Sequence, residues 1–391
     1  MKALPPGYSI RARYQAGFSL IELMIAIALG LLIMAGMLMV FANSSATRSE
    51  LDRTNRQIEN GRYATELLRD DFQLAGFLGE IDMSSVGALP AAMPDPCSNT
   101  LVERTDPAGG TPGVIRLHVQ GVNDVLSSYG TPAPGSPDNL SCLKDASGNF
   151  LVKPGTDVVV VRRLKTCFAG AAGCDALTNG MPYLQVSFCG KPTVPSTSGV
   201  KTHALALYPN AAEFVHQLNA AVGVACTVSS PLRPYVIYVY FVGRDYVTGT
   251  NTILKDDILK RAEFIGTGIG NVTSLVDGIE NLQLEYGVDT LDAAASPPDG
   301  NANVYLSATA INAATPMPVP EKWSNVVSAQ IHLLARNTEI SPGWATDPGS
   351  QKTYDLGPSI VPIADPRDGF RRHVYSTLVR IQNISGRRET P

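Results

Sequence analysis

The chain has 391 residues, of which 44% are hydrophobic and 17% charged, and its formal net charge is −4. This length suffices for one large domain or two small ones. No Lys/Arg-rich run is present, and phosphate binding needs a clustered basic surface, so the composition argues against nucleic acid as the main partner.

Residues 1–17 form a basic leader. It carries Lys2, Arg11 and Arg13 and no acidic residue, and two adjacent prolines disfavour a helix there. Positive charge next to a membrane segment favours the cytoplasmic side. We therefore expect this leader to stay in the cytoplasm while the rest of the chain is exported.

An apolar run follows the leader. From Leu23 to Ala42 the chain has no charged residue. As a helix, this run would span about 30 Å, which is the thickness of the hydrocarbon core of a bilayer. The run is longer than the apolar core of a secretory signal, and no clear small-x-small cleavage site follows it. The sequence therefore predicts one membrane-spanning helix.

The boundary between leader and apolar run reads GFSLIEL, residues 17–23. This string resembles the class III signal of type IV prepilins and type II secretion pseudopilins. The resemblance implies that a prepilin peptidase cleaves after Gly17 and that the new N-terminal residue, Phe18, is N-methylated. It also implies an inner-membrane anchor with a periplasmic head.

Glu22 is the one charge at the start of the membrane helix. A carboxylate there costs about 2–3 kcal/mol on insertion scales unless it meets a cation. Cleavage after Gly17 would give Phe18 an α-ammonium group, and Glu22 of one subunit could pair with that amine on a neighbour. The alternative is that Glu22 extends to the lipid headgroups and pairs with nothing.

Residues 43–79 are expected to continue the helix beyond the membrane. Leu51, Ile58, Thr65 and Phe72 recur every seven residues, and charged residues occupy the opposite side. We expect this amphipathic half to pack on a globular domain and to end at Gly76 or Gly79.

The block GRYATELLRDDFQLAGF, residues 61–77, is similar to the end of the helix in PilW-like minor pilins. Minor pseudopilin J of type II secretion is related but shorter. Blocks 275–289, 327–336 and 370–383 resemble PilW-like proteins more loosely. The resemblance predicts four parts: a leader at 1–17, a membrane or filament-core helix at 18–42, its continuation at 43–79, and a head at 80–391.

The head is predicted to be an α+β domain in which the helix packs on an elaborated antiparallel β-sheet. Strands are expected at 114–120, 157–164, 183–189, 235–243, 280–288, 326–336 and 373–383.

Two of these predicted strands carry more specific expectations. Residues 235–243 are apolar on both faces and should form a central strand. In 280–288, Leu282, Leu284, Tyr286 and Val288 should face inward, while Gln283 and Glu285 should face outward. The long connections are expected to be surface insertions: 121–156, 190–234, 289–322 and 337–369.

Six cysteines are candidates for disulfides in an exported chain: Cys97, Cys142, Cys167, Cys174, Cys189 and Cys226. Cys167 and Cys174 bracket a short loop and are the first pair we expect. The pairing of the other four stays open, and some of the six could be buried free thiols. No CxxC pair or nearby His supports a zinc site.

Motifs that would indicate catalysis are lacking. The five histidines are isolated in sequence, and those at 118, 332 and 373 lie in predicted strands, where a hydrogen-bonded structural role is expected. The glycine-rich GTGIGN, residues 266–271, is predicted to be a turn. Residues 289–303 are rich in Asp and Asn, but they lack EF-hand spacing, so a solvated turn is favoured over a calcium site. No enzyme, cofactor or metal is therefore expected.

The leading hypothesis is a structural minor pilin that helps to prime a type IV pilus, near its tip, and so serves twitching motility. Its expected partners are the prepilin peptidase, other minor pilins, the major pilin, the pilus assembly platform and the membrane. One alternative is a J-like pseudopilin of type II secretion, and another is a pilus-tip adhesin. A membrane-tethered enzyme would regain support if Ser, His and acidic side chains converged in the fold.

Overall fold

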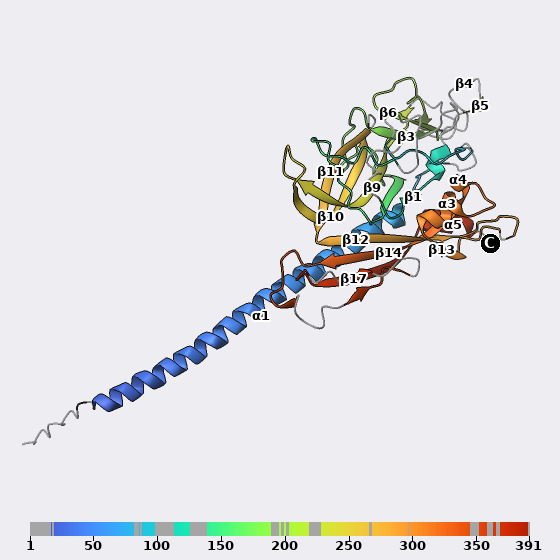
Figure 1. The fold of residues 1–391 in the computed structure, drawn as a ribbon. Coiled ribbons are helices and arrows are strands. Elements are labelled where there is room, and N and C mark those ends of the chain that lie inside the picture. The colour runs from blue at the N-terminus through green and yellow to red at the C-terminus, as the bar shows by residue number, and fades with distance from the viewer. Residues whose placement is uncertain are drawn as a thin grey trace, which may run out of the picture. The chain divides into compact units, whose positions relative to one another are not determined.

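Figure 1 shows the protein as a computed structural model. It describes residues 17, 19–81, 86, 88–97, 113–125, 139–188, 195–196, 199–200, 203–218, 228–265, 268–295, 297–344, 352–357, 363–364 and 368–389. The chain divides into two compact units, residues 1–54 and 55–391, and each is described by itself.

Helix α1, Leu20–Leu74, is continuous and belongs to the first unit up to Thr54. It ends five residues before the predicted boundary at residue 79. The N–H of Ala75 bonds to the carbonyl of Phe72, and Gly76 then adopts a φ of 68°. Because glycine enters this left-handed region without a Cβ penalty, Gly76 ends the helix, as one of the two predicted positions.

The buried face of α1 differs from the predicted heptad face in its first turns. Leu51 is 58% exposed, and Ile58, in the second unit, is 37% exposed, so neither predicted position is buried. Within the second unit, the buried positions instead begin one residue earlier, at Gln57, and they continue at helical spacing. These buried residues are Gln57, Gly61, Ala64, Leu68, Asp71 and Phe72.

The larger sheet of the head has seven antiparallel strands in the order β1-β2-β9-β10-β11, with β3 also pairing with β9 and β6 pairing with β3. Its strands are β1 (Val119–Val122), β2 (Val158–Leu164), β3 (Pro182–Val186), β6 (His203–Leu207), β9 (Leu232–Tyr246), β10 (Ile253–Ile265) and β11 (Gly268–Asp277). Strand β9 lies between β2 and β10, which confirms the predicted central position of residues 235–243.

The smaller sheet has four antiparallel strands in the order β13-β12-β14-β17 (Figure 1). These are β12 (Ile279–Val288), β13 (Val304–Leu306), β14 (Val326–Arg336) and β17 (Arg372–Arg380). Three of these four strands match the predicted runs at 280–288, 326–336 and 373–383. The fold is therefore α+β, with a long apolar N-terminal helix and a head rich in antiparallel sheet.

Short elements complete the head. The helical ones are η2 (Gly113–Arg116), α3 (Ala308–Ala313), α4 (Val319–Ser324) and α5 (Gln382–Arg388). The short strands form three two-stranded sheets: β4 (Pro195–Ser196) with β5 (Gly199–Val200), β7 (Gln217–Leu218) with β8 (Val228–Ser229), and β15 (Thr353–Tyr354) with β16 (Ile363–Ala364).

Two hydrophobic cores lie on opposite faces of the larger sheet. Val159 and Val161 of β2 enter a core shared with Leu68 and Phe72 of α1 and with the smaller sheet. Val158 and Val160, which alternate with them, enter the second core. Because both faces are covered, the first four residues of β2, 158–161, are all valine.

Several sequence predictions about the head are wrong in part. The predicted strand 114–120 begins as the 3-10 helix η2, and β1 starts only at Val119. The segment 190–234 is not a plain insertion, because it contains β6 of the larger sheet, and the segment 289–322 contains β13, α3 and the start of α4. Gln283 and Glu285 do lie on the opposite side of β12 from Leu284, but they are only 2% and 0% exposed, because other segments cover that side too. The predicted turn GTGIGN belongs in part to β11, which begins at Gly268, while residues 266–267 lie outside the described residues.

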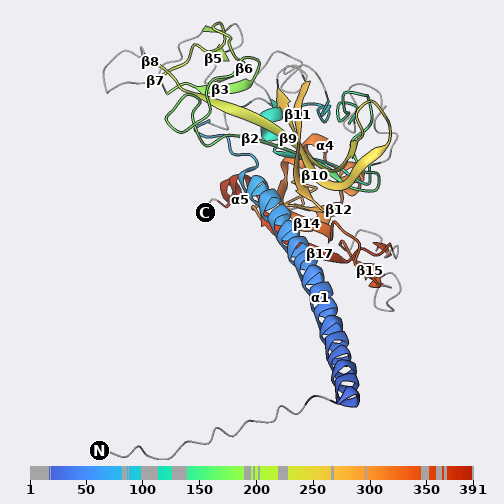
Figure 2. The ribbon, with the colours of Figure 1, turned by 90° about the vertical axis from the view of Figure 1, so that its left-hand side faces the viewer.

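The C-terminal helix α5 lies beside the C-terminal end of α1 (Figure 2). The side-chain amide of Asn383 donates to the carbonyls of Gln73 and Ala75, at 3.2 and 3.3 Å. Helix C-termini leave carbonyls without intrahelical donors, so Asn383 supplies part of the missing cap.

Candidate functional site

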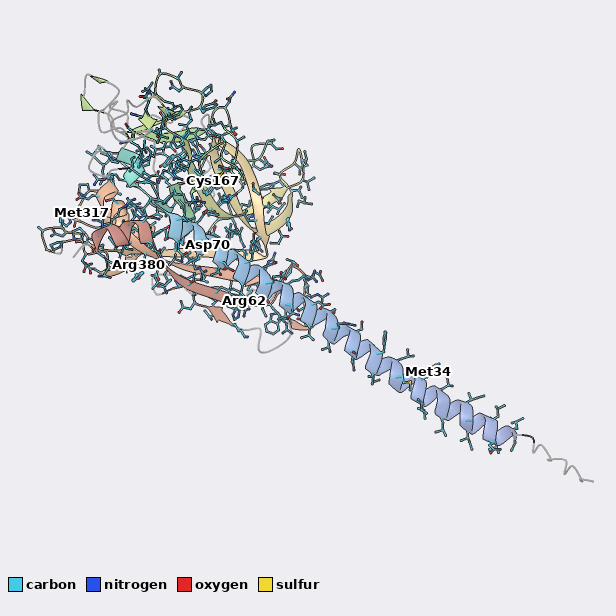
Figure 3. The ribbon with its side chains drawn as sticks, turned by 180° about the vertical axis from the view of Figure 1, so that it is seen from behind. Met34, Arg62, Asp70, Cys167, Met317 and Arg380 are labelled. Atoms are coloured by element: carbon cyan, nitrogen blue, oxygen red, sulfur yellow. A yellow bond between two sulfur atoms is a disulfide. The ribbon has the colours of Figure 1, made fainter. Side chains whose placement is uncertain are left out.

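The N-terminal part of α1 presents apolar side chains on all its sides. Within the first unit, every described residue from Leu20 to Ser49 is exposed. Among them, Leu20 is 76% exposed, Met34, labelled in Figure 3, is 59% exposed, and Phe41 is 73% exposed. Such a surface needs lipid or other apolar helices around it. By length and composition, α1 can cross a membrane.

The segment before α1 holds the predicted processing residues. Gly17 and Ser19 are exposed and lie outside the helix, whereas Phe18 lies outside the described residues. Glu22 is exposed in the first turn of α1, and the N–H of Leu23 bonds to the carbonyl of Ser19 at 3.1 Å. A carboxylate in this turn lies at the positive end of the helix dipole.

A buried ion pair attaches α1 to the larger sheet. Arg163 of β2 donates from Nε and Nη2 to Oδ1 of Asp71, at 3.0 and 2.7 Å, and Tyr240 of β9 donates its hydroxyl to Oδ2. Burial and the neighbouring carboxylate raise the pKa of Tyr240. Nothing in the sequence distinguishes Asp71 from Asp70, because only the fold shows that Asp70 points to solvent and Asp71 does not. Their side chains are 63% and 10% exposed.

Two amides attach α1 to both sheets of the head, Gln57 at the smaller sheet and Asn60 at the end of β11 in the larger sheet. Gln57 donates to the carbonyls of Ala335 and Arg371, at 2.9 and 3.0 Å. Asn60 donates to the carbonyl of Asp277 at 3.0 Å. Together with the Asp71 pair, these bonds fix the rotation of the helix segment 55–74 on the head.

A serine, a histidine and an acidic side chain converge across β12, β14 and β17, which is the arrangement that would support an enzyme. They are Ser376, His332 and Glu285. His332 Nδ1 lies 2.8 Å from the Ser376 hydroxyl, and its Nε2 lies 3.6 Å from Glu285 Oε2. Burial lowers the pKa of His332, although Glu285 opposes that shift. The carboxylate lies beyond hydrogen-bond distance, and His332 is only 4% exposed. We interpret the cluster as the structural histidine that the sequence predicts.

The Asp-rich loop 289–303 is organised by its first carboxylate. Asp289 is fully buried and accepts hydrogen bonds from the backbone N–H groups of Asp299 and Gly300 and from Arg388 of α5. Its oxygens, which a calcium ion would need, are therefore engaged by protein donors. In the part of the chain that the structure describes, no three His, Cys, Asp or Glu side chains form a metal-binding group.

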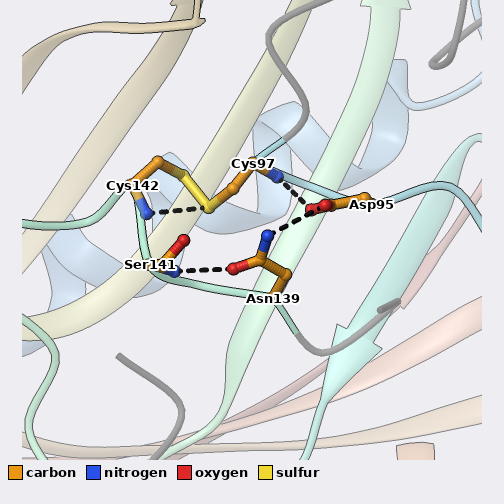
Figure 4. Close-up of a disulfide and its surroundings, with 5 residues drawn as sticks. All are labelled: Asp95, Cys97, Asn139, Ser141 and Cys142. Atoms are coloured by element: carbon orange, nitrogen blue, oxygen red, sulfur yellow. Dashed lines mark hydrogen bonds between the residues drawn. A yellow bond between two sulfur atoms is a disulfide. The ribbon is translucent and has the colours of Figure 1, made fainter. Parts of the chain in front are cut away.

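Two disulfides join loops of the head. Cys167 pairs with Cys174, which confirms the first predicted pair, and Cys97 pairs with Cys142. Figure 4 shows Asp95 beside the second bridge, where it accepts from the N–H of Cys97 at 2.7 Å and from the Asn139 amide at 2.8 Å. Cys189 and Cys226 lie outside the described residues.

Two family models match the chain. Residues 239–383 match the model described as Type IV Pilus-assembly protein W, PilW, and residues 12–38 match the Prokaryotic N-terminal methylation motif. The first match begins within β9 and extends beyond β17, and the second includes Gly17, Phe18 and Glu22. Comparisons with curated proteins and with solved structures gave no match.

Proposed function

This chain is a PilW-like type IV minor pilin, and from that premise we propose that it enters a pilus through its N-terminal helix and helps to prime assembly. The observation that carries the proposal is the apolar surface of residues 20–41, which is exposed on all sides. That surface suits lipid before assembly and neighbouring helices after it. Deleting the gene should reduce surface pili and twitching motility, and unchanged piliation would contradict the proposal.

The proposed first step is cleavage after Gly17 by a prepilin peptidase, followed by methylation of Phe18. The methylation-motif match and the non-helical Gly17 and Ser19 support this step, because a peptidase needs access to an unwound bond. Mass spectrometry of the mature N-terminus tests it. The expected first residue is N-methylated Phe18, and an N-terminus at any other position would contradict the proposal.

Glu22 is proposed to pair with the amine of Phe18 on a neighbouring subunit. An ion pair removes much of the cost of placing a carboxylate among apolar helices. Glu22→Ala should therefore lower incorporation into pili. Glu59→Ala is a matched control, because Glu59 is an exposed carboxylate in the same helix. Equal incorporation of the two variants, with normal methylation, would rule the pairing out.

The proposed partners are other minor pilins, the major pilin and the assembly platform, with the head in the periplasm and later at or near the pilus tip. The match of residues 239–383 to PilW favours pilus assembly over the type II secretion alternative. We propose a structural, non-catalytic role for the head. Cross-linking in the native membrane should capture other minor pilins, and capture of secretion pseudopilins alone would favour the alternative.

A further inference from the structure

Strand β17 forms one edge of the smaller sheet. It pairs with β14 over nine consecutive positions, from Ser328↔Arg380 to Arg336↔Arg372, without a register shift. Among the strands that the structure describes, none pairs with its other side.

The backbone groups on that free side can be assigned from the ends of the ladder. The N–H of Ile381 bonds to the carbonyl of Val327 at 2.8 Å, and the N–H of Asn337 bonds to the carbonyl of Arg371 at 3.1 Å. Hydrogen-bonded pairs alternate along an antiparallel ladder. Odd-numbered residues of β17 therefore direct their N–H and C=O groups to β14, and Val374, Ser376 and Leu378 direct theirs outward.

Between the arginines at its two ends, Arg372 and Arg380, this edge lacks the features that usually protect one. The sequence RHVYSTLVR, residues 372–380, contains no proline or glycine, and β17 pairs with β14 without a bulge. The other long edge, β11, contains two glycines and pairs with β10 through two register shifts. Leu378, in the second half of β17, is 60% exposed. A straight edge with an exposed leucine is a template for a further strand.

We propose that β17 accepts an extended β-strand from the head of a different pilin, so that the smaller sheet continues across two subunits. This inference rests on the proposed function. Outward N–H and C=O groups repeat every two residues along β17, which suits a strand better than a helix or a small molecule. Self-pairing of β17 would close a two-fold dimer, whereas a filament needs heterologous contacts. The partner strand should place an apolar side chain beside Leu378.

The test uses the full-length chain in its native membrane, with a photo-reactive amino acid at Arg380 as the probe. Ultraviolet light should give an adduct with another pilin, identified by mass spectrometry. The same probe at Leu254, which is 69% exposed on β10, should not give this adduct. An adduct with a non-pilin protein, an adduct of two copies of this chain, or no adduct at Arg380 would overturn the proposal.

A second experiment measures the same adduct after substitution of Leu378. Leu378→Pro removes one outward N–H and no bond to β14, so the adduct should fall by about tenfold. Leu378→Ala keeps the N–H and should retain more of the adduct than proline. Leu378→Lys keeps the N–H but adds a charge that protects edges, so it should also reduce the adduct. An unchanged thermal midpoint shows that each variant is folded.

The inference and the proposed function fail differently. If deletion of the gene abolishes pili while Leu378→Pro and Leu378→Lys keep the full adduct, the edge proposal is wrong and the minor-pilin role stands. If deletion leaves piliation unchanged, the proposed function itself is wrong.

Discussion

Gly61 of α1 lies directly against the ring of Tyr375 in β17. A Cβ placed on Gly61 would overlap the Cε2, Cζ and Cδ2 atoms of that ring. The helix backbone therefore packs directly against the smaller sheet at Gly61. This close approach is possible because glycine has no side chain.

Gly61→Ala should destabilise the head. Overpacking of this kind costs about 1–3 kcal/mol, partly offset by the higher helix propensity of alanine. The measurement is the thermal midpoint of the full chain in detergent. Gly386→Ala in α5 is the control, because a Cβ there meets nothing within 4 Å. Tyr375→Ala should remove the effect of Gly61→Ala, and additive losses would contradict the clash.

Asp71→Asn should cost more stability than Asp70→Asn. The first change leaves Arg163 without its buried carboxylate, and breaking a buried pair costs about 3–5 kcal/mol. Asp70 is mostly exposed, so its substitution should have little effect. Denaturant unfolding of the two variants checks this prediction. Equal midpoints would show that the Asp71 pair does not hold α1 in place.

His118 should make the stability of the head depend on pH. Burial lowers its pKa to about 4, although the bond between Nε2 and the Val326 carbonyl opposes this shift. Since the folded-state pKa lies below the unfolded value of 6.5, the unfolded chain binds the proton more tightly. Stability from this site is complete above pH 6.5 and falls by about 3 kcal/mol as the pH drops to 4.

The measurement for His118 is the thermal midpoint of the full chain between pH 6.5 and 4. Other groups titrate in that range, so the informative quantity is the difference between the wild type and His118→Asn. The variant should show a shallower dependence on pH. Parallel curves would assign the pH dependence to other groups.

The two described disulfides should differ in what they contribute. Their sequence separations are 45 and 7 residues. In the chain-entropy estimate, the longer loop corresponds to about 4 kcal/mol and the shorter to about 2 kcal/mol. The double variant Cys97→Ser/Cys142→Ser should therefore lose more stability than Cys167→Ser/Cys174→Ser. The reverse order in denaturant unfolding would contradict the estimate.

We predict that Cys189 and Cys226, whose pairing the sequence leaves open, form a third disulfide. The described segments next to these residues come together: the N–H of Phe188 bonds to the carbonyl of Gln217, and Gln217 pairs with Ser229. Thiol labelling of the denatured, unreduced chain should then find no free cysteine. Two labelled thiols at Cys189 and Cys226 would show that this pair is reduced.

The extent of α1 could be largely predicted because its signals are local. An apolar run follows Gly17, and a glycine suited to the left-handed region ends the helix. The buried face was harder to predict, since Gln57 is polar and Ile58 is apolar. Gln57 is buried because two carbonyls of the head accept from its amide, and periodicity carries no signal of those acceptors.

The same limit applies to β12 and to the attachment of α1. The alternation in β12 predicted which side each residue occupies, but covering segments distant in sequence decide whether Glu285 meets water. Asp70 and Asp71 are identical neighbours in sequence, and only the positions of β2 and β9 separate their roles. Packing between segments distant in sequence thus decides which of these polar side chains are buried, and local sequence patterns do not predict it.

The cap on α1 comes from the other end of the chain. The side chain of Asn383 that serves Gln73 and Ala75 is 310 and 308 residues away from them. These carbonyls therefore lack this donor until almost the whole chain has been synthesised. The head reaches its final form only when synthesis is nearly complete, and a product truncated before Asn383 would carry a helix whose C-terminal carbonyls lack this cap.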